Sequence, residues 1–254
     1  MAKSARDRII VALDVPTEGQ ALELVNELLE HVGLFKVGLE LLNSVGISIV
    51  EKIVERGGVV FLDGKFNDIP NTVAGASRAM ARLGVRMFNV HTMGGLSMMR
   101  CAVKAAEEES VRLRIERPLI LGVTVLTSID RKALNEELRV PGNVEDHVTH
   151  LAALADEAGL DGVIASPHEI DAILRDVRRT MLVVTPGVRP SWAVAHDQKR
   201  IMTPSEAILK GASYLVIGRP ILRPPAEIGT SVEAAKLVQE EIATALERKE
   251  VQRC

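Results

Sequence analysis

Three charged residues at close spacing are the first candidates for chemistry in this chain. Asp63, Lys65 and Asp68 form a D-x-K-x-x-D pattern at the end of an apolar stretch, residues 59–62. In an extended strand, Asp63 and Lys65 would point to one face, because alternate side chains share a face. Asp68 would lie where the strand gives way to the next helix. Taken alone, the pattern is equally consistent with a structural ion pair and a helix-capping carboxylate.

Two further charges belong with this pattern if the chain forms a parallel sheet. Lys36 lies in the preceding apolar stretch, and Asp14 ends the first one. The sheet would then bring together four charges of alternating sign that sum to zero, namely Lys36, Asp63, Lys65 and Asp68. Opposite neighbours favour the charged form of each group. Such an array would suit a reaction that needs a fixed ammonium beside a carbon atom that becomes negative.

A second group of residues, in the last third of the chain, is typical of phosphate binding. Gly218 and Arg219 directly follow the last apolar stretch and precede a predicted helix. A glycine admits the backbone close to an anion, and an arginine supplies a bidentate guanidinium. Arg189, in the segment 185–190 (T-P-G-V-R-P), and Gln198 offer further donors. A lone G-R-P would be a simple turn, but the loops after strands seven and eight of an α/β barrel often bind phosphate.

The elements that would position these residues follow a regular alternation. Eight short apolar stretches cover residues 9–13, 34–37, 59–62, 86–90, 119–126, 162–165, 181–184 and 214–217. Most are continuous, as in strands buried on both faces, and the segments between them have helical period. This alternation predicts a closed (β/α)8 TIM barrel, of the α/β class, as a single domain over residues 1–254. A doubly wound open sheet is the structural alternative.

Composition excludes several classes of protein. The 254 residues carry 31 Lys and Arg against 34 Asp and Glu, a formal net charge of −3, with 47% apolar and 2% aromatic residues. The apolar share is that of a globular protein rather than a disordered one. A basic excess is missing and aromatic side chains for base stacking are few, which argues against binding to nucleic acid.

The sequence also predicts a soluble, cytoplasmic protein with no membrane partner. Cys101 and Cys254 are too few for a disulfide framework, which favours a reducing compartment. Residues 1–8 lack the apolar segment of a secretory signal. No apolar stretch approaches the roughly 18 residues of a spanning helix.

Other common catalytic patterns are missing from the sequence. The six histidines show no H-E-x-x-H, and neither cysteine lies in a zinc-knuckle pattern, so no metal site is predicted. Neither a phosphate-binding Walker loop nor a G-x-G-x-x-G follows the first apolar stretch, which argues against a nucleotide hydrolase or a dehydrogenase.

The charged and phosphate-binding residues belong to a longer series of ordered motifs. The series comprises residues 11–14 (V-A-L-D), 35–38 (F-K-V-G), 63–72 (D-G-K-F-N-D-I-P-N-T), 89–91 (N-V-H), 123–128 (V-T-V-L-T-S), 185–190 (T-P-G-V-R-P), 197–204 (D-Q-K-R-I-M-T-P) and 216–220 (V-I-G-R-P). Over nearly the whole chain it resembles the orotidine 5′-phosphate decarboxylases of the bacterial type. The D-x-K-x-x-D pattern alone is shared with related sugar-phosphate decarboxylases and aldol-type synthases, so the combination carries the specificity.

The resemblance implies conversion of orotidine 5′-phosphate to uridine 5′-phosphate and carbon dioxide, the last step of UMP biosynthesis, without cofactor or metal. Lys65 would be the proton donor to carbon six of the pyrimidine. Asp63 would lie against the departing carboxylate. The ribose hydroxyls would be bound, and the array oriented, by Lys36 and Asp14.

The resemblance also implies a homodimer with shared active sites. The residues that would reach into the partner's site are Asp68, Ile69 and Thr72. Thr127, with Ser128 as the less favoured choice, would contact the base. The phosphate would be held by Arg189, Gln198, Gly218 and Arg219.

One residue departs from the family pattern. The family usually has a bulky aliphatic residue between the aspartate and the lysine, where this chain has Gly64. Its loss would leave a gap costing about 2–5 kcal/mol unless neighbours fill it. Two alternatives stand beside the decarboxylase. The shared D-x-K-x-x-D pattern leaves open a metal-dependent sugar-phosphate decarboxylase or synthase on the same barrel, and Gly64 leaves open a catalytically silent phosphate-binding protein.

Overall fold

The strands of the protein follow one another around a barrel. The computed structural model describes residues 4–177, 181–193 and 202–251. In these residues eight strands are hydrogen-bonded neighbours in sequence order, and the order closes because β8 pairs with β1. They are β1 (Ile9–Ala12), β2 (Leu34–Val37), β3 (Val60–Phe66), β4 (Met87–His91), β5 (Leu119–Val123), β6 (Gly162–Ile164), β7 (Leu182–Pro186) and β8 (Tyr214–Ile217). The fold is the predicted (β/α)8 barrel, not an open sheet.

Each predicted apolar stretch overlaps a strand, and two strand ends that differ from the prediction change the placement of candidate site residues. Strand β3 continues to Phe66, beyond the predicted end at residue 62, so Asp63 and Lys65 lie within the strand. Strand β5 ends at Val123, earlier than predicted, which leaves residues 124–126 in the segment that follows.

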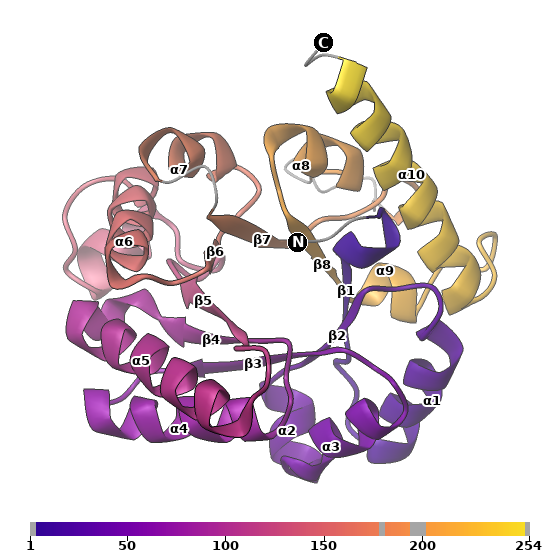
Figure 1. Cartoon of the computed structure of the whole chain (residues 1–254). Coiled ribbons are helices and arrows are strands. Elements are labelled where there is room, and N and C mark those ends of the chain that lie inside the picture. Colours follow the sequence, from indigo (N-terminus) through magenta and orange to yellow (C-terminus); the bar gives the residue numbers. More distant parts are fainter. Residues whose placement is uncertain (1–3, 178–180, 194–201, 252–254) are drawn as a thin grey trace. The chain divides into compact units, whose positions relative to one another are not determined.

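The chain divides into two compact units, Met1–Asp63 with Thr185–Cys254, and Gly64–Val184. The first unit has the helical elements η1 (Arg6–Arg8), α1 (Glu18–Leu28), α2 (Leu39–Val45), α3 (Ser48–Glu55), η4 (Ser191–Ala193), α8 (Pro204–Lys210), α9 (Arg219–Leu222) and α10 (Ser231–Val251). The second has α4 (Pro70–Arg82), η2 (Thr92–Gly94), α5 (Gly95–Leu113), η3 (Ala133–Glu137), α6 (Val144–Ala158) and α7 (Ile170–Asp176) (Figure 1). The single-domain organisation stays a prediction.

In the first unit, strand register determines which residues meet at the strand ends. Every residue of β1, β2 and β8 is buried. Lys36 pairs with Ala12 of β1 on one side and with Phe61 of β3 on the other. Residues just beyond Ala12 and Phe61 therefore lie beside Lys36. Helix α8 begins with a capping box between Thr203 and Glu206, so the end of the 197–204 motif is a helix start.

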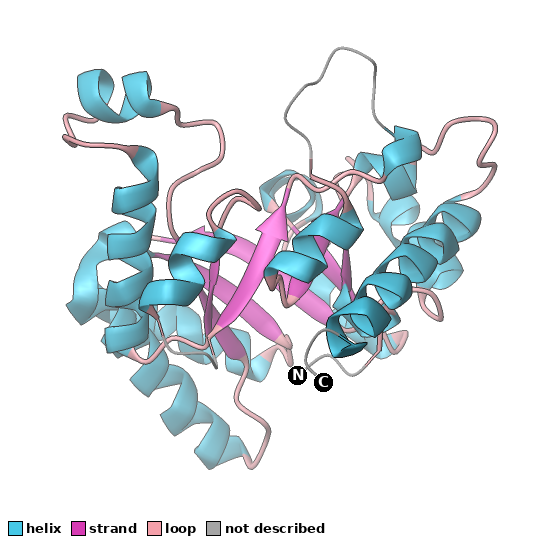
Figure 2. Ribbon diagram, turned by 90° about the horizontal axis from the view of Figure 1, so that it is seen from above, coloured by secondary structure: helices cyan, strands magenta, loops and turns pink. Residues whose placement is uncertain are grey.

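In the second unit, β4 to β7 form a parallel ladder, and helices cover the strands of each unit (Figure 2). Helices α4 and α5 are joined by Glu109, whose carboxylate accepts hydrogen bonds from Arg82 and Arg112. These two guanidinium groups lower the pKa of Glu109 to about 2. No helix in the described part of the chain is long and apolar enough to cross a membrane.

Candidate active site

The ammonium group of Lys36 lies between two carboxylates in the first unit. Its Nζ is 3.2 Å from Asp14 Oδ1 and 3.4 Å from Asp63 Oδ2. Lys36 and Asp63 are 8% and 9% exposed, whereas the side chain of Asp14 is half exposed. Buried charges are stable only when paired, so each group holds the others in place. The structure thus brings Lys36 together with Asp14 and Asp63, whereas the predicted array of Lys36, Asp63, Lys65 and Asp68 stays a prediction.

Gly38 provides the space for this ammonium, a role that sequence reasoning did not assign. A Cβ atom at Gly38 would lie 2.6 Å from Lys36 Nζ and 3.6 Å from Asp14 Oδ1. Any side chain there would push the ammonium away from its carboxylates. The F-K-V-G motif contained the signal, since a glycine two residues after a buried lysine indicates close approach.

Lys65 departs from the extended conformation that the sequence analysis assumed. Its φ is +48°, in the left-handed region, and its backbone N–H donates to Asn89 Oδ1 at 2.7 Å. Simple alternation along β3 therefore does not set the direction of its side chain. Lys65 is half-buried, two residues beyond Asp63 in the same strand.

The space beside Gly64 is filled by an aromatic ring. A Cβ atom at Gly64 would lie 2.8 Å from Cε1 and 3.2 Å from Cζ of Phe66. That ring also packs against Phe88, with ring centroids 6.0 Å apart. Phe66 thus occupies the volume that was expected to be a gap, so no cavity penalty follows from the missing side chain.

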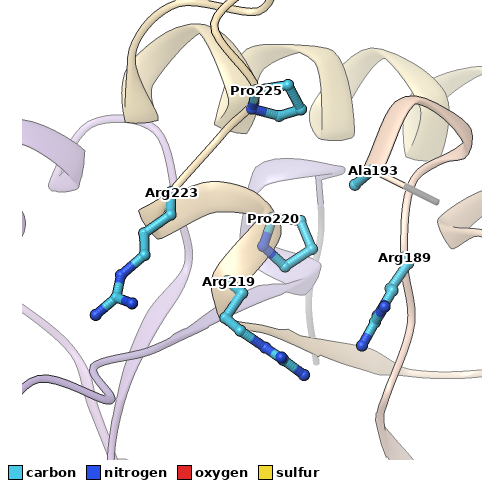
Figure 3. A pocket seen from close by; sticks show the side chains of 6 residues that line it. All are labelled: Arg189, Ala193, Arg219, Pro220, Arg223 and Pro225. Atoms are coloured by element: carbon cyan, nitrogen blue, oxygen red, sulfur yellow. The ribbon is translucent and has the colours of Figure 1, made fainter. Parts of the chain in front are cut away.

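Three arginines line a pocket of about 160 Å³ in the first unit. The pocket wall consists of Arg189, Ala193, Arg219, Pro220, Arg223 and Pro225. Figure 3 shows the guanidinium groups of Arg189 and Arg219 directed to the same side, while Arg223 extends from the other side of the turn. The described residues of its wall include three cationic and no acidic side chains, so the pocket is suited to an anion.

Local structure fixes the two predicted arginines. The backbone N–H of Arg189 donates to Met202 O at 3.1 Å, which ties Arg189 to the residue two before the start of α8. Arg219 begins α9, a single helical turn of four residues. A helix this short has only a small dipole, so its start contributes little positive charge to the pocket. The positive charge comes from the arginine guanidinium groups.

Sequence reasoning missed Arg223, the third arginine of the pocket. It lies four residues beyond Arg219 and is exposed. Neither Arg219 nor Arg223 forms an ion pair with any other residue in the described ranges. The sequence offered no clear signal for Arg223, because it lies just past the end of α9 and not on a helical turn with Arg219.

The anion pocket and the ion-paired cluster meet at Gly218. A Cβ atom at Gly218 would lie 3.6 Å from Asp14 Oδ2 and 3.5 Å from the Cβ atom of Ala12. The residue that precedes Arg219 therefore lies against the carboxylate that binds Lys36. A molecule with an anionic group in the pocket would extend toward Asp14 and Lys36.

The remaining predicted residues are exposed in the second unit or lie outside the described residues. Asp68 accepts a hydrogen bond from the backbone N–H of Ile69 at 2.6 Å, and Ile69, not Asp68, is the N-cap of α4. Thr72 is in the first turn of α4, and Thr127 follows β5. Gln198 lies outside the described residues, so its contact with the phosphate stays a prediction.

Outside this site, Glu169 is a titratable group with a large upward pKa shift. Burial raises the pKa of Glu169 to about 7, and the backbone N–H of Ser166 partly offsets this effect. The carboxylate closes the turn between β6 and α7. Within the described ranges, no three His, Cys, Asp or Glu side chains are grouped so that they would hold a metal ion.

The fold and the site together define a class of protein. Parallel barrels with an anion pocket beyond strands seven and eight are phosphate-binding barrels, and here a buried ion-paired lysine lies next to that pocket. The chain belongs to the orotidine 5′-phosphate decarboxylase / HUMPS family, whose sequence profile matches residues 7–234.

Relatives of known name cover nearly the full chain. The orotidine 5′-phosphate decarboxylase of Heliobacterium modesticaldum is 50% identical over 245 residues, 96% of this chain and 99% of that one. The enzyme of the same name from Moorella thermoacetica is 52% identical over 238 residues, 94% and 93% of the two chains. The crystal structure of the Lactobacillus acidophilus orotidine 5′-phosphate decarboxylase superposes with a TM-score of 0.80 at 34% identity, covering 92% and 98%.

Substitution of Gly64 tests whether the Phe66 ring is fixed. We expect Gly64→Ala to lower the free energy of unfolding by about 1–3 kcal/mol, because the new methyl group overlaps a ring held by Phe88. Urea unfolding measures the change. Gly19→Ala is the matched control: Gly19 is an exposed residue of α1 with nothing within 4 Å of a Cβ, so the change should cost no stability and should add about 0.5–1 kcal/mol from helix propensity. A Gly64→Ala protein as stable as wild type would show that the ring moves freely.

Proposed function

We propose that this protein decarboxylates orotidine 5′-phosphate to uridine 5′-phosphate, in pyrimidine biosynthesis, and does so in the cytoplasm without metal or cofactor. The observation that carries the proposal is the short distance between Gly218, which precedes Arg219 of the arginine pocket, and the Asp14 carboxylate that binds Lys36: a Cβ atom at Gly218 would lie 3.6 Å from Asp14 Oδ2. A nucleotide has this pattern: a phosphate at one end and, next to it, a ribose with hydroxyl groups. The 50% identity to curated relatives with this name supports the assignment.

The reaction needs an environment that stabilises a negative carbon. Loss of carbon dioxide from carbon six of the pyrimidine leaves a carbanion, and the ring offers no ready electron sink. A preorganised ammonium in a site shielded from water stabilises that charge without reorganisation. We assign this role to Lys65, which then donates a proton to the same carbon.

The other charged residues orient the substrate and the ammonium. Asp63, nearly buried, would lie against the departing carboxylate, and its repulsion of that group would raise the energy of the bound substrate. Asp14 and Lys36 would bind the ribose hydroxyls. Their mutual ion pair keeps both side chains fixed before substrate arrives, so little ordering remains to be done on binding.

The arginine pocket would hold the 5′-phosphate. Arg189 and Arg219 present guanidinium groups to one side, and Gly218 leaves its backbone open to a phosphate oxygen. Gln198 and Thr127 would add contacts to the phosphate and to the base. Binding energy from this remote group helps to hold the pyrimidine against the array, where it lowers the barrier.

We also propose a homodimer in which Asp68, Ile69 and Thr72 enter the partner's site. In the second unit each of three strands is followed by an exposed apolar side chain: Ile69 after β3, Met93 after β4 and Leu126 after β5, with exposed fractions of 67%, 52% and 39%. Exposed apolar side chains gathered at the same end of parallel strands mark a protein interface. Such an interface would bury Ile69 and bring the neighbouring Asp68 to the partner.

The turnover of orotidine 5′-phosphate in excess EDTA tests the proposed activity. We expect the pyrimidine absorbance to fall as substrate is consumed, because the proposed chemistry uses side chains alone. The competing function, a metal-dependent sugar-phosphate decarboxylase or synthase, predicts turnover of a sugar phosphate only, and only with Mg²⁺. That second result would overturn the proposal.

The variant Lys65→Ala is the control for this assay. It should lose at least about a thousandfold in kcat, because both the ammonium and the proton donor are removed. Uridine 5′-phosphate should still bind, measured by calorimetry, since the arginine pocket is untouched. Full activity in this variant would refute the role of Lys65.

Mixing two inactive variants tests the shared site. Lys65→Ala and Asp68→Ala proteins should each be inactive, but a mixed dimer contains one site with both native residues. After subunit exchange, roughly a quarter of wild-type activity should return, because about half of the dimers are mixed and each has one intact site. Native mass spectrometry confirms exchange. Exchange without recovered activity would contradict the shared site.

The two unpaired arginines of the pocket should differ in their effect. Arg219→Gln should raise KM for orotidine 5′-phosphate by roughly 10–100-fold, since a charged hydrogen bond to the phosphate is lost. Arg223→Gln should have a smaller effect that fades with added salt, because its guanidinium points away from the other two. Steady-state kinetics at two salt concentrations separates the effects. Equal, salt-insensitive losses in both variants would show that Arg223 binds the phosphate directly.

A further inference from the structure

Lys65 has a backbone conformation that a residue with a long side chain rarely adopts. Its φ of +48° lies in the left-handed region, although the residue belongs to β3. Contact between Cβ and the carbonyl oxygen disfavours this region for most residues other than glycine. Such a conformation persists only where its surroundings hold it, and residues of this kind cluster at functional sites. The question is therefore what holds Lys65.

The side chain of Asn89 is bonded to this irregular residue. Asn89 Oδ1 accepts the backbone N–H of Lys65 at 2.7 Å, and Asn89 is 0% exposed. A backbone N–H needs an acceptor, and at this irregular residue the carboxamide oxygen of Asn89 provides one. Asn89 is itself fixed, because its backbone pairs in register with Leu121 of β5.

A second contact joins the same two strands beside this hydrogen bond. Phe66, the residue after Lys65, packs on Phe88, the residue before Asn89. The Phe66 ring lies over Gly64, where only a glycine leaves room for it. Residues on both sides of Lys65 are thus tied to β4 and to one another. At Lys65 itself, the peptide N–H is held by the side chain of Asn89.

We propose that Asn89 is a positioning residue for the reaction: by holding the Lys65 backbone in its left-handed conformation, it aims the ammonium at the reacting carbon. The inference rests on the proposed role of Lys65 as proton donor. A rotation at the backbone is magnified along the four-carbon side chain of lysine, and a misplacement of about 1 Å can cost a hundredfold in rate. Asn89 acts through the backbone of Lys65 and not on the phosphate pocket.

A pair of substitutions separates the acceptor from the volume of the side chain. Asn89→Leu keeps a similar size but removes the oxygen, whereas Asn89→Asp keeps an oxygen acceptor. We expect Asn89→Leu to lower kcat roughly a hundredfold, with KM and the affinity for uridine 5′-phosphate nearly unchanged. Asn89→Asp should restore kcat to within about tenfold of wild type. Hydrogen exchange should show faster exchange at the Lys65 amide in Asn89→Leu only.

Ser77→Ala serves as the structural control. Ser77 is also fully buried in the second unit, and its hydroxyl donates to Val73 O at 2.8 Å, so the variant loses a comparable buried hydrogen bond. It should lose stability but keep kcat within about twofold. If Asn89→Leu fails to fold, Asn89→Ser, whose hydroxyl is too short to reach, must show the same loss of kcat.

The outcomes distinguish this inference from the function on which it rests. An Asn89→Leu or Asn89→Ser enzyme with kcat near that of wild type overturns the positioning role and leaves the decarboxylase assignment intact. A fall in kcat matched by an equal loss of nucleotide affinity also overturns it, because that result indicates general disruption. A wild-type protein that does not turn over orotidine 5′-phosphate overturns the proposed function and this inference with it.

Discussion

The buried ammonium of Lys36 needs opposite charges close to it, and the surrounding structure supplies them. A cation so enclosed is stable only with opposite charges beside it, and Asp14 and Asp63 lie within 3.4 Å. Parallel strands supply these partners directly, because β1 and β3 flank β2, and Asp14 and Asp63 come just after the residues that pair with it. Gly38 leaves room for the ammonium, and Gly218 brings the anion pocket against Asp14. The strand order, the glycines and the pocket therefore serve one electrostatic arrangement.

Much of this arrangement was predictable because it follows from regular geometry. Continuous apolar stretches indicated eight parallel strands, and each stretch contains one. Strand order then placed Asp14 and Asp63 beside Lys36, since neighbouring parallel strands end together. The G-R-P and T-P-G-V-R-P motifs indicated an anion site, and Arg189 and Arg219 line one pocket. In each case the inference needed only a periodicity and a residue type.

The remainder was not predictable because it depends on irregular backbone and on tertiary contacts. Alternation along β3 assumed an extended Lys65, but its φ is positive. Gly64 suggested a cavity because a sequence does not reveal that the Phe66 ring folds back over it. The helix after Gly218 was expected to contribute its dipole, but it ends after one turn. Gly38 is close to the Lys36 ammonium, and Arg223 lines the arginine pocket. Both placements depend on the folded backbone and do not follow from spacing in the sequence.

The pairing of the Asp14 and Asp63 carboxylates with Lys36 disfavours binding of a metal ion at this cluster. The D-x-K-x-x-D pattern alone is compatible with either kind of chemistry. Here Asp14 and Asp63 both face the Lys36 ammonium at ion-pair distance. A divalent cation bound by these oxygens would lie close to a buried positive charge and would be repelled by it. An ammonium in this position instead balances the charge of both carboxylates.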